Sequence, residues 1–445
     1  MLKALLPGMM LILNIMPGTA LAEPVLLISV DGLRPGDVIE ADKRGLNIPN
    51  LRRFLTEGSY ASGVVGILPT VTYPSHTTLI TGASPDRHGI VSNTTFDPKA
   101  INQGGWYWYA RDIKVPTLWD AAAKAGLSVA NVHWPVSVGA ASIRWNLPQY
   151  WRTGHADDLN LMKALATPGL VESLEAEVGA PYAQGIDESI EGDENRGSFA
   201  AQLIKDQKPD FATVYLTALD HQQHVSGPDT PEAHRVLERI DDIIGRLIAT
   251  ERNAHPDAVI ALVSDHGFAP TSVEVDLFRA FIDEKLISLD ADGKIAEWQA
   301  VPWIAGGSIA IVLSRPNDSA LQQRVGALLN RLKDNPEMRI AAIIARSEIA
   351  SMRGNPQASF YLDLAPGAMS GGFAGPTASV TRPSHYKGMH GYFPAAPTMR
   401  STFMMMGPMI ARGHSFGEID MRAIAPTLAR IMKVSLSTAE LSALK

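Results

Sequence analysis

Short runs of consecutive apolar residues alternate along this chain with segments whose apolar residues recur at helical spacing. The apolar runs are typical of strands buried on both faces of a parallel sheet. These predicted strands cover residues 24–30, 128–133, 210–217 and 258–264. The segments predicted as helices cover residues 48–58, 116–126, 156–207 and 230–250. The alternation predicts an α/β fold with a doubly wound, mostly parallel sheet flanked by helices.

The pattern becomes less regular over residues 268–383. A strand is predicted at 308–313 and a helix at 319–333, and a Gly/Ala/Pro-rich piece covers 365–376. We interpret this segment as a cap subdomain inserted into one catalytic domain of residues 23–445. A final helix is predicted over 421–432.

The first 22 residues carry the pattern of a secretory signal peptide. Lys3 precedes an apolar run at residues 4–16, and Ala20-Leu21-Ala22 is a small-x-small cleavage signal. We therefore expect cleavage after Ala22 and a secreted or periplasmic protein. The alternative is a retained N-terminal anchor; no later stretch is apolar enough to span a membrane.

Composition adds three limits to this picture. Hydrophobic residues make up 46% and charged residues 19% of the 445 residues, as in ordinary globular proteins. The net charge of −7, without a long Lys/Arg run, gives no indication of a nucleic acid polymer as partner. There is no cysteine, so a metal site has to use His, Asp, Glu or hydroxyl ligands.

Potential metal ligands follow several of the predicted strands, at the edge where open α/β sheets bind ligands. Three carboxylates and three imidazoles could divide between two divalent ions, with zinc or another first-row metal suiting the mixed N/O set. Each motif alone also fits an ordinary turn or a surface pair. The residues are Asp31, Asp220, His224, Asp265, His266 and His390.

The stretch Leu68–His76 carries a candidate nucleophile. Pro74 is expected at the first position of a helix through residues 75–80, which places Thr72 at the helix N-terminus. A hydroxyl there is more often a helix cap, but coordination to a metal would acidify it and make it a nucleophile. Thr70 and Ser75 stay open as alternatives. Two ions about 4 Å apart are the arrangement used for in-line displacement at phosphorus. Asn93, after a predicted loop at 85–90, could then donate a hydrogen bond to a phosphoryl oxygen.

Aromatic residues Trp106–Tyr109 lie in a glycine-framed loop. They fit a pocket for a stacked base or a choline group, and equally a hydrophobic plug over the sheet edge. His133 has no metal-ligand partner at a useful spacing, so we predict a structural role for it.

Taken together, these motifs resemble the nucleotide pyrophosphatase/phosphodiesterase family of the alkaline phosphatase superfamily. The resemblance rests on the order Asp31, Pro-Thr-Val-Thr-Tyr-Pro-Ser-His, Asn93, Asp220-x-x-x-His224-x-x-Gly-Pro, Ser-Asp265-His266-Gly and Gly-Met-His390-Gly-Tyr. It extends from Val25 to about Pro394. The family usually has Phe-Pro-Asn-His where this chain has Tyr-Pro-Ser-His.

The resemblance implies an alkaline-phosphatase-like fold and two zinc ions. Asp220, His224 and His390 would hold one ion, and the other would be held by Asp31, Thr72, Asp265 and His266. It selects Thr72 as nucleophile and Asn93 as the phosphoryl-oxygen donor. Trp119 joins Trp106 and Tyr109 as an expected substrate-pocket residue.

The activity implied is hydrolysis of small-molecule phosphodiesters, of nucleotide or phospholipid-headgroup type, through a covalent threonine-phosphoryl intermediate. The first alternative is a phosphomonoesterase on the same fold. Such enzymes add a Lys/Arg pair, whereas the region after His133 offers Arg144 and Arg152 without a clear Lys-x-Arg. A second alternative is an inactive binding protein, but such a protein would be expected to have lost ligands or the nucleophile, and none is missing here.

Overall fold

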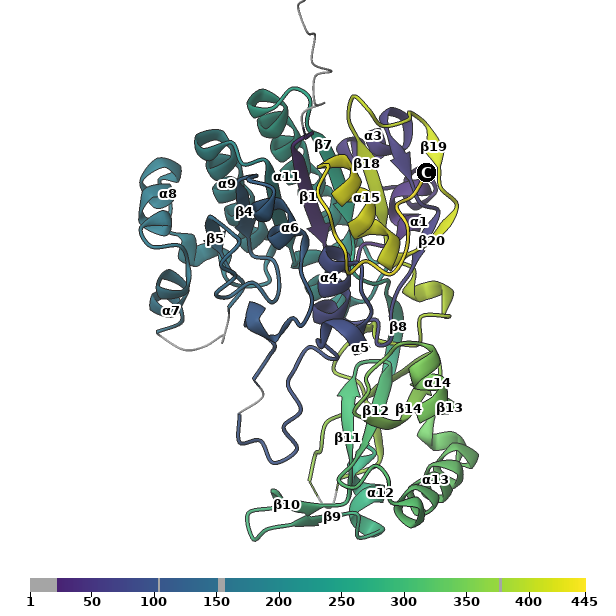
Figure 1. Ribbon diagram of the computed structural model, residues 1–445. Coiled ribbons are helices and arrows are strands. Elements are labelled where there is room, and N and C mark those ends of the chain that lie inside the picture. Colours follow the sequence, from purple (N-terminus) through teal and green to yellow (C-terminus); the bar gives the residue numbers. More distant parts are fainter. Residues whose placement is uncertain (1–21, 103–104, 151–156, 376–377) are drawn as a thin grey trace, which may run out of the picture.

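The computed structural model describes residues 22–102, 105–150, 157–375 and 378–445 (Figure 1). The predicted signal peptide therefore lies, except for Ala22, outside the described residues. In the described part of the chain, no helix combines the length and the apolar character needed to cross a membrane.

An eight-stranded sheet forms the centre of the upper part of the molecule in Figure 1. In spatial order its strands are β19 (His414–Ser415), β2 (Ser59–Tyr60), β18 (Phe403–Met406), β7 (Val259–Val263), β1 (Val25–Val30), β6 (Phe211–Leu216), β4 (Val129–Val132) and β5 (Trp145–Leu147). The last five strands of this order, from β7 to β5, run parallel, and β18 joins β7 antiparallel. The predicted doubly wound, mostly parallel sheet is confirmed.

The central strands are buried on both faces because their side chains alternate between two hydrophobic cores. In β1, Leu26 and Ile28 belong to one core, whereas Val25 and Leu27 belong to the other. The first core is closed by the helices α3 (Pro49–Glu57), α8 (Leu170–Val178), α9 (Ile190–Gln207) and α11 (Pro231–Ala254). The second core is closed by α4 (Thr72–Thr81), α6 (Leu118–Lys124) and α15 (Ile424–Ile431). This two-sided packing explains the continuous apolar runs in the sequence.

The helices match the predicted segments with a few shifts. The predicted helix over 156–207 is three helices, and the predicted loop after Gly82 contains a short helix, α5. The α-helices outside the 268–383 segment are α1 (Pro35–Ile39), α2 (Ala41–Arg44), α3 (Pro49–Glu57), α4 (Thr72–Thr81), α5 (Pro85–His88), α6 (Leu118–Lys124), α7 (Asp158–Leu165), α8 (Leu170–Val178), α9 (Ile190–Gln207), α10 (Ala218–Ser226), α11 (Pro231–Ala254) and α15 (Ile424–Ile431).

The less regular segment forms a second group of strands and helices, drawn below the main sheet in Figure 1. It has a separate hydrophobic core, to which a few residues from outside the segment, such as Leu68 and Val91, also contribute. Its elements are β8 (Ala269–Val275), α12 (Phe278–Asp283), β9 (Ile287–Leu289), β10 (Ile295–Trp298), β11 (Ala300–Ala305), β12 (Ser308–Leu313), α13 (Ser319–Asp334), β13 (Ile340–Ala345), α14 (Arg346–Ser351), β14 (Ala358–Leu364), β15 (Gly367–Ser370) and β16 (Thr381–Pro383). That this group is an inserted cap subdomain stays a prediction.

Three short strands complete the fold. β3 (Gly63–Val65) pairs with β20 (Glu418–Asp420), beside the main sheet. β17 (Gly388–Met389) pairs antiparallel with β8, and β8 begins soon after β7. This pairing brings the segment that follows β17 back to the edge of the main sheet where β7 ends.

Candidate metal and active site

The predicted ligands come together at the carboxyl ends of neighbouring strands of the main sheet. Asp31 follows β1 directly, and Asp265 and His266 follow β7. Asp220 lies in the first turn of α10, which begins two residues after β6. The strand order β7-β1-β6 places these three chain segments side by side.

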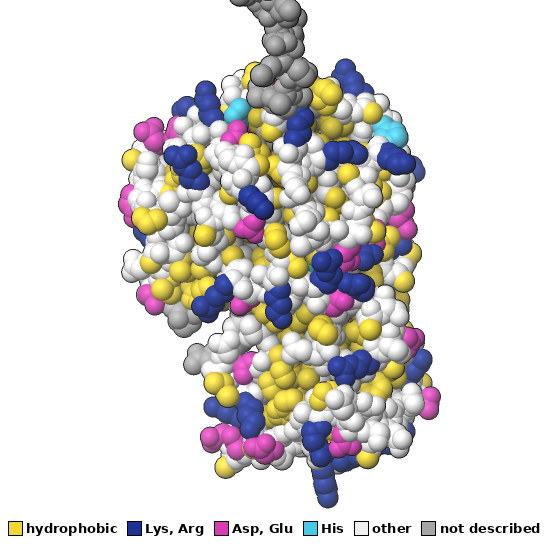
Figure 2. All heavy atoms as spheres, in the orientation of Figure 1, with side chains coloured by type: hydrophobic (Ala, Val, Ile, Leu, Met, Phe, Trp, Pro, Cys, Tyr) yellow, Lys and Arg dark blue, Asp and Glu magenta, His cyan; other side chains and the backbone are white. Residues whose placement is uncertain are grey.

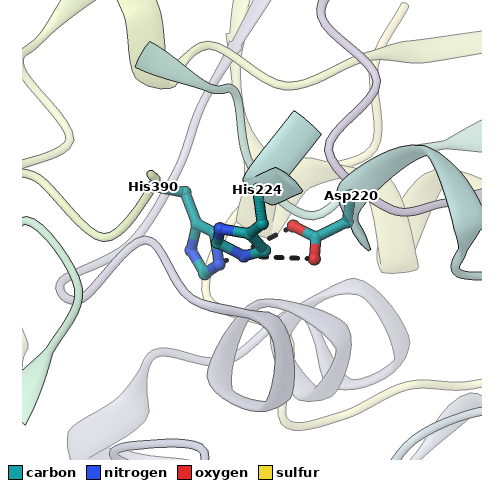
Figure 3. Close-up of side chains that lie close together, drawn as sticks. All are labelled: Asp220, His224 and His390. Atoms are coloured by element: carbon teal, nitrogen blue, oxygen red, sulfur yellow. Dashed lines mark ion pairs between the residues drawn. The ribbon is translucent and has the colours of Figure 1, made fainter. Parts of the chain in front are cut away.

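Three of these side chains form a first group, drawn in Figure 3: Asp220, His224 and His390. The Asp220 carboxylate faces both imidazoles, with 3.3 Å between Oδ2 and Nε2 of His224 and 3.7 Å between Oδ1 and Nε2 of His390. Asp220 and His224 share one face of α10, as their spacing of four predicts. His390 directly follows β17 and joins the group from a segment that is distant in the sequence.

A second group shares Asp220 with the first and adds Asp31 and His266. The His266 Nε2 atom lies 3.3 Å from Oδ1 of Asp31 and 3.1 Å from Oδ2 of Asp265. Asp265 also accepts a hydrogen bond from the backbone N–H of Gly32, at 3.2 Å. Asp220 thus stands between two sets of ligands that the sequence divided into separate sites.

The three imidazoles are oriented alike by backbone carbonyls. The Nδ1 atoms of His224, His266 and His390 lie 2.9, 3.1 and 3.2 Å from the carbonyl oxygens of Gly388, Gly267 and Thr70. Because a carbonyl oxygen only accepts, each Nδ1 carries the proton and donates it. Each Nε2 then faces the carboxylates and, when it carries no proton, offers its lone pair to a metal ion, which is the arrangement of a metal-binding histidine.

Among the described residues, no Lys or Arg forms an ion pair with these carboxylates. Oδ1 of Asp31, Oδ1 of Asp220 and Oδ2 of Asp265 are buried and accept no hydrogen bond from the described residues. Burial raises the pKa of Asp31, and the charges of Asp265 and Asp220 raise it further. Burial, followed by the charge of Asp220, raises the pKa of Asp265 to about 8. Buried carboxylates whose ionised forms are disfavoured in this way require protons or cations to balance them, and together with the neighbouring imidazole nitrogens they fit divalent metal cations.

Thr72 is the first residue of α4 and is 8% exposed. Its hydroxyl oxygen lies 3.5 Å from Nε2 of His266, beside the second group of ligands. Pro74 occupies the third helical position, not the predicted first one. It is tolerated there because N–H groups of the first turn have no partner within a helix.

Buried His76 holds the start of this helix. Its Nδ1 atom donates to the carbonyl oxygen of Thr72 at 2.9 Å, and its Nε2 atom lies 2.9 Å from the hydroxyl of Ser29. Burial lowers the pKa of His76 to about 3, so its imidazole is neutral. These contacts give His76, the histidine of the Leu68–His76 stretch, a structural role.

Asn93 lies beside the same helix start. Its carboxamide oxygen accepts a hydrogen bond from the backbone N–H of Tyr73 at 2.9 Å, which caps α4. Because the oxygen is used in this way, the amide NH2 group is the end of the side chain that can serve a ligand. The structure therefore brings Asn93 next to Thr72, as expected.

A pocket of about 170 Å³ opens over these groups. Expected residues among its lining are Asp31, Thr72, Asn93, Trp106, Asp220, His224 and His390, while fully buried Asp265 and His266 lie outside the lining. Lining residues that the sequence analysis did not select are Tyr73, Gln149, Glu188, Tyr215, His221 and Tyr386. None of these lining residues comes from the described part of the 268–383 segment.

Tyr215 was missed because it lies inside the apolar run of β6, where nothing in the pattern distinguishes it. Its hydroxyl donates a hydrogen bond to Oδ2 of Asp31. Only the pairing of β6 with β1, which sets Tyr215 opposite Ser29, reveals this contact. Gln149, Glu188 and Tyr386 come from connecting segments that carry no motif.

Two expected pocket residues are placed elsewhere. Trp119 is 1% exposed, belongs to the core on the α4 side of the sheet, and donates to the hydroxyl of Thr213 at 3.3 Å. Tyr109 is 39% exposed, and its ring packs under the guanidinium of Arg111. His133 is buried against the ring of Tyr215 and lies outside both ligand groups, in keeping with a structural role.

Comparison with known proteins shows the family of this chain. A family model described as "Type I phosphodiesterase / nucleotide pyrophosphatase" matches residues 25–392. Ectonucleotide pyrophosphatase/phosphodiesterase family member 3 of Rattus norvegicus is 25% identical over 261 residues, which are 56% of this chain and 25% of that protein. A pyrophosphatase/phosphodiesterase of Schizosaccharomyces pombe, named as uncharacterized, is 27% identical over 274 residues, 60% of this chain and 47% of that protein. The chain thus spans between a quarter and a half of the length of these relatives.

Solved structures share the fold over nearly the whole chain. Human ectonucleotide pyrophosphatase/phosphodiesterase 5 superposes with a TM-score of 0.63 at 19% identity, covering 93% of this chain and 96% of that one. The murine protein gives a TM-score of 0.65 at 18% identity, with coverage of 95% and 98%. With the family model matching most of its length, the chain belongs to the type I phosphodiesterase/nucleotide pyrophosphatase family.

Proposed function

We propose that this protein is an exported, metal-dependent phosphodiesterase/nucleotide pyrophosphatase. The observation that carries the proposal is the pair of ligand groups, joined at Asp220, beside the hydroxyl of Thr72. One ion would be held by Asp220, His224 and His390, and a second by Asp31, Asp265, His266 and Thr72. Zinc is our first choice because the ligands are a nitrogen and oxygen set without thiolates. Divalent cations bound there would acidify the threonine hydroxyl and neutralise charge on the phosphoryl oxygens.

The residues of the chain then perform an in-line displacement at phosphorus. The Thr72 oxygen attacks, its proton passes to solvent, and an Oγ–P bond forms as the bond from phosphorus to the leaving oxygen breaks. The leaving oxygen takes a proton from water and departs as an alcohol or as a nucleotide. Water then attacks phosphorus, breaks the Oγ–P bond and releases the phosphate monoester, which restores the hydroxyl of Thr72.

Asn93 and the start of α4 would stabilise the negative charge that develops on the phosphoryl oxygens during this attack. In this proposal the amide NH2 group of Asn93 donates to a non-bridging phosphoryl oxygen, as donors of oxyanion holes do. His76 and Asn93 both fix the backbone around Thr72, so the nucleophile needs little reorganisation before it reacts.

The names of similar proteins support the same activity. Several relatives are venom phosphodiesterases, among them one of Crotalus adamanteus, which is 25% identical over 262 residues. One solved structure is described as an inactive threonine-to-alanine variant of the murine phosphodiesterase 5 in complex with AMP. These names favour a threonine nucleophile and a nucleotide substrate for this chain as well.

Charge in the pocket favours diesters over monoesters. The pocket lining, within the described residues, contains no Lys or Arg to bind the additional charged oxygen of a monoester. Arg144 stacks on the ring of Trp145, away from the lining, and Arg152 lies outside the described residues. An inactive binding protein is disfavoured because all seven expected ligands, including Thr72, are present.

The test compares a nitrophenyl nucleotide diester with a nitrophenyl phosphate monoester. The purified protein should have the higher kcat/KM for the diester, lose its activity after treatment with a chelator, and regain it when Zn²⁺ is restored. A clear preference for the monoester would contradict the diesterase assignment. Full activity in protein shown to contain no divalent metal would contradict the role of the ligand groups.

A further inference from the structure

Tyr73 binds two carboxamide side chains at once. Its backbone N–H donates to the carboxamide oxygen of Asn93, and its hydroxyl donates to that of Gln149, at 2.9 and 2.6 Å. Tyr73 and Gln149 are 1% and 4% exposed, and all three residues line the pocket.

An amide held by its oxygen presents its nitrogen on the other side. In Gln149 the oxygen is occupied by Tyr73, so the two N–H donors are the end of the planar group that is left for a ligand in the pocket that this residue lines. A short bond between buried groups also restricts the rotamers of Gln149. The donor is therefore oriented before any ligand binds, which lowers the entropy cost of binding.

Gln149 and Asn93 serve different parts of the pocket. Asn93 is bound by the backbone N–H of Tyr73, next to Thr72, whereas Gln149 is bound at the far end of the Tyr73 side chain. Trp106 lies edge-on to the Tyr73 ring, with 5.1 Å between the ring centroids, and also lines the pocket. Gln149 thus contacts the end of Tyr73 that is remote from the backbone beside Thr72, and the rings of Tyr73 and Trp106 form an aromatic wall of the pocket.

We propose that Gln149, oriented by the hydroxyl of Tyr73, is a specificity-determining residue that binds an acceptor atom on the organic group of the diester. A flat ring with a carbonyl group, such as a nucleobase, would offer that acceptor while it contacts the aromatic wall. This inference rests on the proposed function for its substrate class. Tyr73 acts through Gln149 and is a positioning residue.

The test measures binding, so that it does not depend on turnover. Metal-loaded protein carrying Thr72→Ala, which removes the proposed nucleophile, is titrated with uridine 5′-monophosphate and with ribose 5-phosphate in a calorimeter. Adding Gln149→Leu should weaken uridine monophosphate binding about 3- to 10-fold, the effect of losing one hydrogen bond. Ribose 5-phosphate, which lacks the base, should bind as before. Gln149→Glu keeps an acceptor for Tyr73 but removes the donor, and should weaken uridine monophosphate binding too.

The role of Tyr73 is tested by a double-mutant cycle. Tyr73→Phe alone should weaken uridine monophosphate binding, and adding it to Gln149→Leu should produce no further loss, because both changes remove the same oriented donor. Gln357→Leu, at an exposed position, is the matched control and should change neither ligand. Melting temperatures identify any variant that fails to fold, in which case the remaining two variants carry the test.

Three results would overturn the inference. The parent could bind uridine monophosphate no more tightly than ribose 5-phosphate, the Gln149 variants could leave both affinities unchanged, or they could weaken both ligands equally. Failure of the proposed function would be seen separately, as a lack of diester turnover by protein with Thr72 intact.

Discussion

Asp220 is the residue on which both ligand groups depend. Its carboxylate faces His224 and His390 with its two oxygens and also belongs to the group of Asp31 and His266. Burial raises its pKa, but the neighbouring histidines His224, His390 and His266 lower it more, so that the carboxylate is ionised. An ionised carboxylate in this position would place negative charge beside both proposed ions and so favour the binding of each.

Asp220→Asn tests this shared role. The amide keeps the size of the side chain but removes the charge, so we expect metal affinity to fall by more than about 100-fold, beyond the loss typical of residues that only orient a ligand. Chelator competition and elemental analysis of the purified variant measure the effect. Asp206→Asn, at an exposed site in α9, is the control. Wild-type metal content in the Asp220 variant would show that the groups are not a metal site.

At the scale of elements, the position of α10 depends on α9. Asp193 of α9 accepts hydrogen bonds from the backbone N–H groups of Thr217 and Ala218, at 2.9 and 2.8 Å, and thereby caps the start of the helix that carries Asp220. It also pairs with Arg196, and both side chains are 0% exposed. This buried pair connects a helix on the face of the sheet to the ligand groups at its edge.

Asp193→Ala should therefore destabilise the fold and disturb the site. Removing the carboxylate leaves the Arg196 guanidinium buried without its partner and α10 without its cap, for an expected loss of about 3–5 kcal/mol in the free energy of unfolding. Denaturant unfolding measures this, with Asp206→Ala on the exposed face of α9 as control. A change below about 1 kcal/mol would mean that α10 is held by other contacts.

Much of this element-scale structure follows from the sequence, because each strand and helix has a local signal. The apolar runs identify β1, β4, β6 and β7, and Thr230 with Pro231 marks the start of α11, where the hydroxyl of Thr230 does accept from the N–H of Ala233. Residues placed by long-range packing have no such signal. Asp193 holds the start of α10, and Tyr215 donates to Asp31, each from a neighbouring element. Trp119 faces the core because it lies on the side of α6 that packs against the sheet.

At the scale of the whole molecule, the site draws on residues from Asp31 to His390, so it exists only when the full sheet and the segment after β17 are assembled. From the sequence we could predict which strand ends carry candidate ligands but not that Asp220 lies between the two groups. That depends on the β7-β1-β6 order, which brings distant parts of the chain together. The first described residues lead directly into β1, one of the central strands.

Export is the prediction that concerns the entire chain. When the full-length gene is expressed in a bacterium with a periplasm, we expect mature protein outside the cytoplasm whose N-terminal residue is Glu23. Replacing the small residues of the cleavage signal, as in Ala20→Asp with Ala22→Asp, should block this processing. N-terminal sequencing reads the result. Exported protein that keeps residues 1–22 would favour the retained anchor instead.

The nucleophile is the central claim, and trapping the covalent intermediate tests it most directly. Metal-loaded protein is mixed with excess nitrophenyl thymidine 5′-monophosphate, quenched in acid and digested for mass spectrometry, alongside a Thr72→Ala variant of measured metal content. We predict a thymidylyl group on Thr72, and loss of both the adduct and turnover in the variant while its metal is retained. Near-full turnover by Thr72→Ala, or an adduct on Thr70 or Ser75, would contradict the account.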